Sequence, residues 1–379
     1  MNQTPEIFDV IIIGGGLAGL SSAIHLSKHH LHILVLEKNN YPKHKVCGEY
    51  ISNEVLPYLE YLGVDVFQLE AQKINKFELS TPKNKLIKSD LPLGGFGISR
   101  YTLDNALYEK VKNQKVKTLQ DLVTDVQFFN DEFSVETKQN NTFKAKIVIG
   151  AFGKRSNLDV TLERDFIKKK SPFLAVKMHV KGDFPNDLVA LHNFKGGYCG
   201  VSKVENDVIN LCYITDFEAF KAYKDIEEFQ QNVVFKNTYL KVIFKNAIPV
   251  FEQPLTISQI SFSNKNPIEN HIIMCGDTAG MIHPLCGNGM SMAIRSAQLA
   301  SYLIIDYLQG KIKSRLELEK AYQKSWNSEF KTRLNVGHFV AKLFSKNQLA
   351  EVLITVLKRF PKLLPTIIKQ THGKPMVVK

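Results

Sequence analysis

Three glycines at positions 14, 16 and 19 follow a short apolar run and precede a stretch with helical spacing. In this GxGxxG pattern the first glycine permits a tight turn, and the second lets backbone N–H groups approach a pyrophosphate. The third allows the helix to pack closely on a sheet. The pattern predicts a dinucleotide site, and a glycine turn without a ligand is the alternative. The expected contacts are Gly14, Gly16, Leu17, Ala18 and Gly19.

Glu37 extends this site, because it lies 18 residues beyond Gly19 at the end of a second strand-like run. A carboxylate at such a position accepts hydrogen bonds from the ribose hydroxyls of an adenosine.

A second glycine-rich segment starts at Gly276, directly after another apolar run, and a helical pattern follows it. An enzyme that binds NAD alone does not need this second half, whereas FAD does. Asp277 can bind the ribityl hydroxyls, and backbone N–H groups from Gly287 to Met290 can face the pyrimidine edge of a flavin. The two segments together predict FAD, with second-segment contacts at Gly276, Asp277, Pro284, Gly287, Asn288, Gly289 and Met290.

Apolar periodicity predicts the elements that hold these segments. Buried strands are expected at Phe8 to Ile13, Leu31 to Leu36, Phe143 to Ile149 and His271 to Cys275. Helices are expected at Leu17 to Lys28, Tyr101 to Asn113 and Ser291 to Leu308, and Phe173 to Tyr213 alternates as an antiparallel sheet does. We therefore predict an α/β protein. A Rossmann-like FAD-binding domain encloses an antiparallel β-sheet substrate domain and is followed by a C-terminal helical region.

The length of 379 residues fits two domains. The expected FAD-binding domain is discontinuous and covers residues 1–70, 93–165 and 256–330. The substrate domain covers 71–92 and 166–255, and residues 331–379 form a basic helical region. In this last region one helical face is expected to hold Val352, Leu353, Val356, Leu357 and Phe360, opposite Lys358, Arg359 and Lys362. An amphipathic helix most often packs on its own protein, here over the substrate pocket, and contact with an anionic membrane is the alternative.

Longer segments resemble a known family. GxGxxG with its downstream Glu, a Gly-Asp strand end and Pro-x-x-Gly-x-Gly resemble the p-hydroxybenzoate hydroxylase superfamily of flavoproteins. Residues 42–49 (PKHKVCGE), 99–104 (SRYTLD) and 276–280 (GDTAG) resemble the geranylgeranyl reductase branch and related flavin-dependent dehydrogenases and halogenases. The resemblance implies an FAD-dependent oxidoreductase with a GR2-type FAD domain. It also implies FAD contacts at Lys38, Lys45, Cys47, Gly48, Arg100 and Gly153.

The sequence departs from the family pattern in two places. Hydroxylases of the superfamily carry an Asp-Gly linked to NADPH binding, where this chain has Phe152 and Gly153. We therefore expect slow direct reduction by NADPH, and NAD(P)H stays one candidate electron donor. Geranylgeranyl reductases carry an aromatic-x-Trp-x-Phe-Pro segment, where this chain has Tyr198-Cys199-Gly200-Val201. A prenyl substrate is therefore not carried over.

Three side chains are candidates for catalysis. The resemblance places Cys47 beside the flavin ring, where it could gate or protonate a substrate, and a packing role is the alternative. His283 could donate a proton at the flavin face or serve only its loop. Tyr198 is expected in the pocket wall. The sequence shows no metal-ligand spacing, so no metal is expected.

The interpretation is an FAD-dependent oxidoreductase for a hydrophobic small molecule derived from a lipid, isoprenoid or polyketide. Reduction of a double bond by hydride transfer is slightly favoured. An FAD-dependent monooxygenase that hydroxylates an aromatic or lipid molecule is the alternative. An electron-transfer flavoprotein subunit is an alternative of another class. The substrate, the electron donor and the oligomeric state stay open.

The formal charge of +12 is concentrated in residues 331–379, which hold ten Lys or Arg and one acid. A basic tail on a near-neutral body favours a local partner such as a membrane surface, and no zinc-finger or RNP-type pattern indicates nucleic acid. The five cysteines form no CxxC pair, which favours a reducing compartment. We expect a cytoplasmic protein. Besides the substrate, its candidate partners are the inner face of the membrane, through peripheral contact, and a redox protein.

Overall fold

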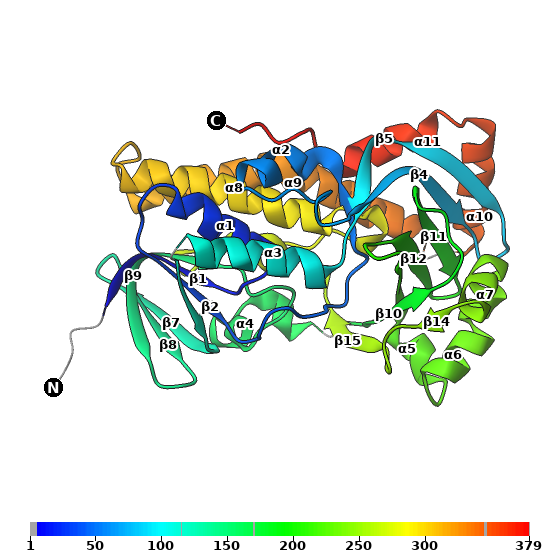
Figure 1. Cartoon of the computed structure of the whole chain (residues 1–379), viewed down its shortest axis with the longest axis horizontal. Coiled ribbons are helices and arrows are strands. Elements are labelled where there is room, and N and C mark those ends of the chain that lie inside the picture. Colours follow the sequence, from blue (N-terminus) through cyan, green and yellow to red (C-terminus); the bar gives the residue numbers. More distant parts are fainter. Residues whose placement is uncertain (1–5, 115, 170, 345–346, 379) are drawn as a thin grey trace.

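The computed structural model describes residues 6–114, 116–169, 171–344 and 347–378. Two β-sheets lie side by side, and the long helices α8 (Gly289–Leu308) and α9 (Arg315–Phe344) run along one side of them (Figure 1). The predicted α/β fold is confirmed.

Strand β1 (Ile7–Ile13) lies near the centre of the first sheet, where it pairs in parallel with β2 and β9. Parallel strands covered on both faces are expected to be continuously apolar, and β1 is apolar except at Asp9. The remaining strands in the sheet are β2 (Ile33–Glu37), β6 (Lys117–Gln120), β9 (Thr142–Gly150), β16 (Ile268–Glu269) and β17 (Ile272–Met274), with the hairpin β7 (Val123–Phe129) and β8 (Glu132–Thr137) attached to β9.

Helix α1 (Leu17–Ser27) connects β1 and β2 and packs between this sheet and the helices α3 (Arg100–Asn113) and α8. The close approach needs Gly19, since a Cβ added there would lie 1.9 Å from the carbonyl oxygen of Gly14. The strands and helices predicted for this half are confirmed, with ends shifted by at most two residues. Two short helices, α2 (Leu56–Tyr61) and α4 (Asn157–Thr161), and the single turns η1 (Asn53–Val55), η2 (Asp165–Lys168), η4 (Gly276–Thr278) and η5 (Pro284–Cys286) complete it.

The second sheet is antiparallel except where β11 pairs in parallel with β4. Its strands, in order from one edge, are β14 (Ile248–Pro249), β10 (Phe173–Lys181), β13 (Ile209–Asp216), β12 (Gly197–Lys203), β11 (Leu188–Phe194), β4 (Gln72–Ser80), β5 (Leu86–Gly97) and β3 (Tyr50–Ser52), and β15 (Leu255–Ile260) also pairs with β10. The antiparallel sheet expected from Phe173 to Tyr213 is confirmed. The residues assigned to this domain from the sequence leave out β3, the end of β5 and most of β15. The exact limits of the domain stay a prediction.

Every residue of β11 is buried, because both faces of the second sheet are covered. On one face the side chains of Phe229 and Leu240 pack against the sheet. They belong to α6 (Ile226–Asn232) and α7 (Thr238–Lys245), which lie with α5 (Phe217–Lys221) and η3 (Val234–Lys236) on that side. The opposite face meets the C-terminal helices α10 (Asn347–Arg359) and α11 (Leu363–Thr371).

The protein covers only part of the apolar face of α10. Ile354 and Leu357 are buried against the second sheet, and Ala350 is also buried. Val352 and Val356 of the same helix, and Phe360 directly after it, are exposed. The spacing of apolar residues does not show which part of a broad apolar face meets the protein. Within the described residues, the structure shows no helix with the length and apolar character needed to cross a bilayer.

Candidate functional site

The glycines of the site divide into two kinds. Gly14 has a φ of +104° and Gly19 abuts its carbonyl, so both are required by the backbone itself. Gly16, Gly48 and Gly153 border open space, although Gly153 also has a positive φ of +87°. A Cβ at Gly16 would meet only the Arg100 guanidinium at 3.7 Å, and one at Gly48 or Gly153 would meet nothing within 4 Å. These three glycines form a cradle in which backbone N–H groups can reach a ligand.

Glu37 is tied directly to the turn that follows β1. Its carboxylate accepts hydrogen bonds from the backbone N–H of Gly15 (2.7 Å) and from the backbone and side chain of Asn39 (2.9 and 2.6 Å). The hydroxyl of Tyr41 donates to the carbonyl oxygen of Gly15. The strand-end carboxylate therefore lies beside the glycine turn, as an adenosine ribose site requires.

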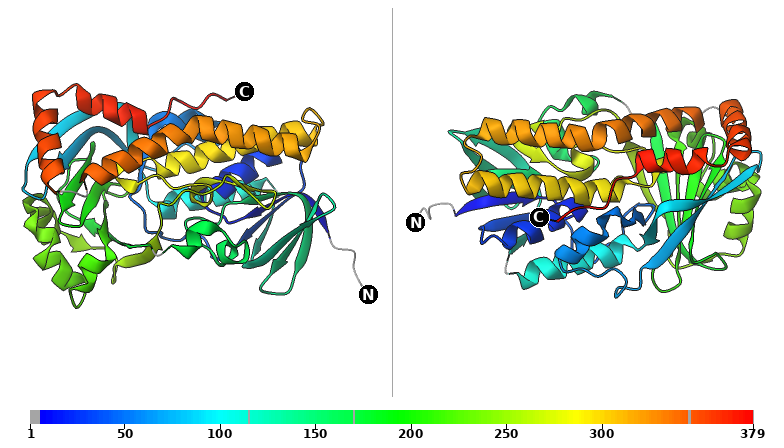
Figure 2. Two further views of the ribbon diagram at one scale, coloured as in Figure 1. Left: turned by 180° about the vertical axis from the view of Figure 1, so that it is seen from behind. Right: turned by 90° about the horizontal axis from the view of Figure 1, so that it is seen from above.

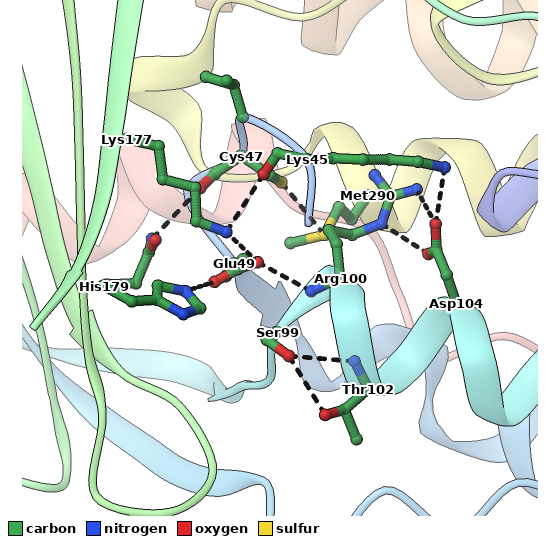
Figure 3. Close-up of polar contacts among 12 residues, drawn as sticks. Lys45, Cys47, Glu49, Ser99, Arg100, Thr102, Asp104, Lys177, His179 and Met290 are labelled. Atoms are coloured by element: carbon green, nitrogen blue, oxygen red, sulfur yellow. Dashed lines mark hydrogen bonds and ion pairs between the residues drawn. The ribbon is translucent and has the colours of Figure 1, made fainter. Parts of the chain in front are cut away.

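Beside the cradle, Arg100 lies in a group with Asp104 and Lys45 (Figure 3). Arg100 Nε and Nη2 each donate to one oxygen of Asp104 at 2.7 Å, and Lys45 Nζ donates to the same carboxylate at 2.8 Å. Burial alone would raise the pKa of Asp104, but the two cations outweigh burial and lower that pKa. The group holds two positive charges and one negative charge, so the cradle has a positive side suited to a pyrophosphate.

A second charged cluster links the cofactor half to the second sheet (Figure 3). Glu49 is fully buried, and its carboxylate accepts from Lys177 Nζ and from the backbone N–H of Arg100 (2.8 Å), while His179 Nε2 lies 2.6 Å from its other oxygen. Burial alone would raise the pKa of Glu49, but Lys177 and His179 outweigh it and lower that pKa. Glu49 therefore stays ionised at neutral pH.

The same sheet holds the loop that carries Cys47. Lys177 Nζ donates to the carbonyl oxygen of Lys45 (3.1 Å), and Asn210 Nδ2 donates to that of Cys47 (3.2 Å). Cys47 Sγ lies 3.5 Å from the sulfur of Met290, at the start of α8. The loop is therefore held from both sides.

The second glycine-rich segment also lies at the cradle. Gly287 is left-handed (φ +63°), which turns the chain into α8 so that the helix starts at Gly289. Lys265 Nζ donates to the carbonyl oxygens of Asp277 and Lys154, both at 2.8 Å, and burial lowers the pKa of Lys265 to about 8. A helix N-terminus and nearby lysines provide positive charge on this side too.

A cavity of about 500 Å³ lies between the two sheets and the C-terminal helices. Its cradle end is formed by most of the residues predicted to contact FAD: Gly16, Leu17, Ala18, Cys47, Gly48, Arg100, Gly153, Gly276, Asp277, Pro284, Gly287, Asn288, Gly289 and Met290. The other predicted contacts, which are Gly14, Gly19, Glu37, Lys38 and Lys45, are outside the lining of the described cavity. Their contact with FAD stays a prediction.

Beyond the cradle the cavity is apolar. The second sheet contributes Leu79, Val189, Leu191, Tyr198 and Ile214. Helix α9 contributes Val340 and Leu343, and the C-terminal helices contribute Leu353, Leu364 and Ile367. A bound molecule would have one end among charged and glycine residues and the other among aliphatic side chains.

The three catalytic candidates differ in position. Cys47 and Tyr198 line the cavity, and burial raises the pKa of Tyr198 well above 10. His283 is not among the described lining residues: its Nδ1 accepts from the N–H of Leu285 (3.4 Å), and its ring lies 4.6 Å from that of Phe262. Burial lowers the pKa of His283 to about 4, so its ring is neutral at pH 7. This position favours the loop role, and the roles of all three stay predictions.

Sequence reasoning missed Lys177 and His179, and for the C-terminal region it did not identify which individual residues line the cavity. Lys177 and His179 are two positions apart on β10, so they share one face of a strand whose other residues are apolar except for the terminal Lys181. That pair of basic residues was the available signal. Their shared partner, Glu49, lies 128 and 130 residues away in the sequence, and no local pattern connects them.

The fold and the glycine cradle define a Rossmann-type protein for a flavin dinucleotide. Residues 8–325 match the family model for the FAD binding domain, and the chain belongs to this family. FAD is its cofactor, and the protein is an FAD-dependent oxidoreductase.

Similar proteins cover several chemistries. A digeranylgeranylglycerophospholipid reductase of Methanococcus vannielii is 23% identical over 357 residues, which are 89% of this chain and 85% of that protein. The FAD-dependent monooxygenase olcE of Penicillium canescens is 28% identical over 176 residues, or 42% and 37% of the two chains. The solved structure of the flavin-dependent brominase Bmp2 has a TM-score of 0.79 at 16% identity and covers 96% of this chain and 93% of that one.

Gly16→Val tests the cradle. The added side chain would enter open space, so we expect a folded protein with less than about a tenth of the wild-type FAD content, because valine occupies the approach of the pyrophosphate. FAD is measured by absorbance and by release on heat denaturation. Ala222→Val, at an exposed position outside the cavity lining, is the control for added bulk and should retain FAD. A yellow Gly16→Val protein would contradict the assignment.

Glu49→Gln tests the buried cluster. The change leaves Lys177 buried without its counter-ion, and we expect a loss of about 3–5 kcal/mol of unfolding free energy at pH 7. Since the folded pKa of Glu49 is lowered, its contribution is present above the ordinary value of 4.5 and is lost as pH falls through the folded pKa. The difference from wild type should therefore shrink below about pH 4.5.

Urea unfolding between pH 7 and acid pH measures this difference. Glu109→Gln, which removes an exposed partner of Lys112, is the control and should change stability by less than about 1 kcal/mol. Equal losses in the two variants would contradict the role given to Glu49.

Proposed function

We propose that this oxidoreductase acts on a lipid or another long apolar molecule. The observation that carries the proposal is the cavity, which extends from the glycine cradle to aliphatic side chains of α10 and α11. Burial of an alkyl chain there stabilises a complex by about 25 cal/mol per Å² of apolar surface. The similarity to a digeranylgeranylglycerophospholipid reductase over 89% of this chain supports the same substrate class.

Reduction of a carbon–carbon double bond is the reaction we favour. FAD supplies two-electron chemistry when bound. The chain must then hold the double bond at the cradle end, exclude water and deliver a proton to carbon. Cys47 is half-buried at this end of the cavity, and we assign its thiol as the proton donor. Burial raises the pKa values of the nearby Cys212 and Cys286 to about 12, which makes these thiols weak acids.

A monooxygenase is the second candidate, which the similarity to olcE favours. It would hold its substrate in the same cavity but would consume oxygen. Phe152, at the position where an acidic residue was expected for NADPH use, packs with the first hydrophobic core. Slow direct reduction by NADPH stays a prediction, with a redox protein as the other electron donor. A pure electron-transfer subunit would need no substrate cavity of this kind.

An anaerobic single-turnover experiment separates the two reactions. FAD-loaded protein is reduced with dithionite and mixed with an isoprenoid lipid in detergent. We expect the flavin to be reoxidised without oxygen, and mass spectrometry should find a product heavier by two hydrogens. Oxygen-dependent turnover with a product heavier by one oxygen atom would establish the monooxygenase instead. Hydrogen peroxide is assayed alongside to detect uncoupled oxidation.

Cys47→Ala tests the proton donor. We expect unchanged FAD content and substrate turnover slower by more than about tenfold, which corresponds to about 1.4 kcal/mol of barrier. Cys199→Ala is the control, because this thiol is packed in the second core, and it should keep its rate. Wild-type turnover in Cys47→Ala would reduce Cys47 to a packing residue.

A further inference from the structure

Helix α10 carries a stripe of exposed apolar side chains, which we call the outer stripe. It consists of Val352, Val356 and Phe360, whose exposed fractions are 61%, 41% and 58%. Spacing of four residues places them on one side of the helix. Leu349 precedes the stripe and Leu363 of α11 follows it, with exposed fractions of 43% and 44%. Apolar side chains of this size, gathered on one helix, mark an interaction surface.

Basic residues border the outer stripe. Lys358, Arg359 and Lys362 are exposed at the end of α10 and in the turn to α11. The only acid in residues 331–379 of the sequence is Glu351, and its carboxylate lies 3.3 Å from Lys85 Nζ of the second sheet. The charge around the stripe is therefore positive.

The other side of the same helix reaches the cavity. Leu353 and Leu357 of α10 line it, as do Leu364 and Ile367 of α11. Phe339 of α9 also lines the cavity while 63% of its surface is exposed, so the cavity wall continues to the surface among these helices. Both views of Figure 2 show α10 at the end of the molecule that lies away from the first sheet. Helix α10 thus has the outer stripe on its exposed side and the far end of the cavity on its inner side.

We propose that the outer stripe docks this protein on the surface of an anionic lipid bilayer. A short amphipathic helix with apolar side chains and a basic border lies in the interface of a membrane, where anionic lipids attract its lysines and arginines. A second copy of the chain fits less well, because two surfaces of the same positive charge would repel each other. This docking goes beyond the proposed function and does not depend on turnover.

Vesicle co-sedimentation of FAD-loaded, full-length protein tests the proposal. The probes are vesicles of phosphatidylcholine alone and vesicles with about 30% phosphatidylserine. We expect binding to the anionic vesicles only, and raising NaCl from about 0.05 to 0.5 M should weaken it, because salt screens the attraction. FAD content and melting temperature, measured for every variant, show that the fold is intact.

Two triple variants separate the apolar and charged parts. We expect each variant to partition to anionic vesicles at least about tenfold more weakly than the wild-type protein. For the charge variant the reason is that each basic residue near the membrane surface strengthens binding roughly fivefold. The apolar variant is Val352→Ser, Val356→Ser and Phe360→Ser, and the charge variant is Lys358→Gln, Arg359→Gln and Lys362→Gln. Matched controls at exposed sites elsewhere should bind as wild type does: Phe129→Ser, Val160→Ser and Val242→Ser for the first, and Lys138→Gln, Lys181→Gln and Lys221→Gln for the second.

Several outcomes would overturn the proposal. Wild-type protein that ignores anionic vesicles, or an apolar variant that binds them as well as its control, removes the bilayer as the occupant. A wild-type dimer in sedimentation velocity that the serine variant converts to monomer would assign the outer stripe to a second copy. Protein that binds vesicles but reduces no lipid leaves docking intact and refutes only the proposed function.

Discussion

The buried carboxylate of Glu49 holds together the parts of the molecule on which the site depends. Its partners come from both sides: the backbone N–H of Arg100 belongs to α3, and Lys177 and His179 belong to β10. An ion removed from water costs several kcal/mol unless partners replace the lost hydration. Glu49 is therefore stable only when the first half of the molecule and the second sheet are correctly placed. The Glu49 cluster therefore couples the position of α3 to the position of β10.

The same contacts fix the position of the loop that precedes Glu49. Lys45 and Cys47 are held through their carbonyl oxygens by β10 and β13, while the side chain of Lys45 reaches Asp104 on α3. Gly48, between Cys47 and Glu49, leaves open space at the cradle. A loop fixed at both ends can place a thiol beside a cofactor without depending on the cofactor for its shape. The electrostatic cluster therefore acts on the chemistry by positioning, although Lys177 and His179 lie outside the described cavity lining.

Hydrogen bonds also join the C-terminal part of the chain to the second glycine-rich segment and the helix that follows it. Asn288, just before α8, donates through its side chain to the carbonyl oxygen of Thr371 (2.8 Å). The backbone N–H of Met376 donates to the carbonyl oxygen of Glu54 (2.8 Å), and Gln298 Nε2 donates to that of Val377 (3.0 Å). The end of α11 and the segment after it are thus hydrogen-bonded to α8, to its N-cap and to Glu54.

The sequence predicted the parts of the site that are local. The glycine turn needs only neighbouring residues to form, because Gly14 supplies the positive φ and Gly19 the close approach. Arg100 was expected near FAD, but its bidentate pairing with Asp104 was not, although the two are four residues apart on one helix. The link from Glu49 to β10 joins residues more than a hundred positions apart and requires the tertiary fold.

Helix α10 shows why a helical pattern alone could not place the C-terminal region. Apolar residues occupy both its inner side, at Ile354 and Leu357, and its outer side, at Val352 and Val356. A helix at a water boundary has one apolar stripe, whereas a helix that is apolar on two sides has an apolar neighbour on each. The cavity and the second sheet are the inner neighbours. The exposed Val352 and Val356 belong to the same broad apolar face as the buried Leu357, so the proposed contact with a bilayer would cover the part of that face that the protein leaves open.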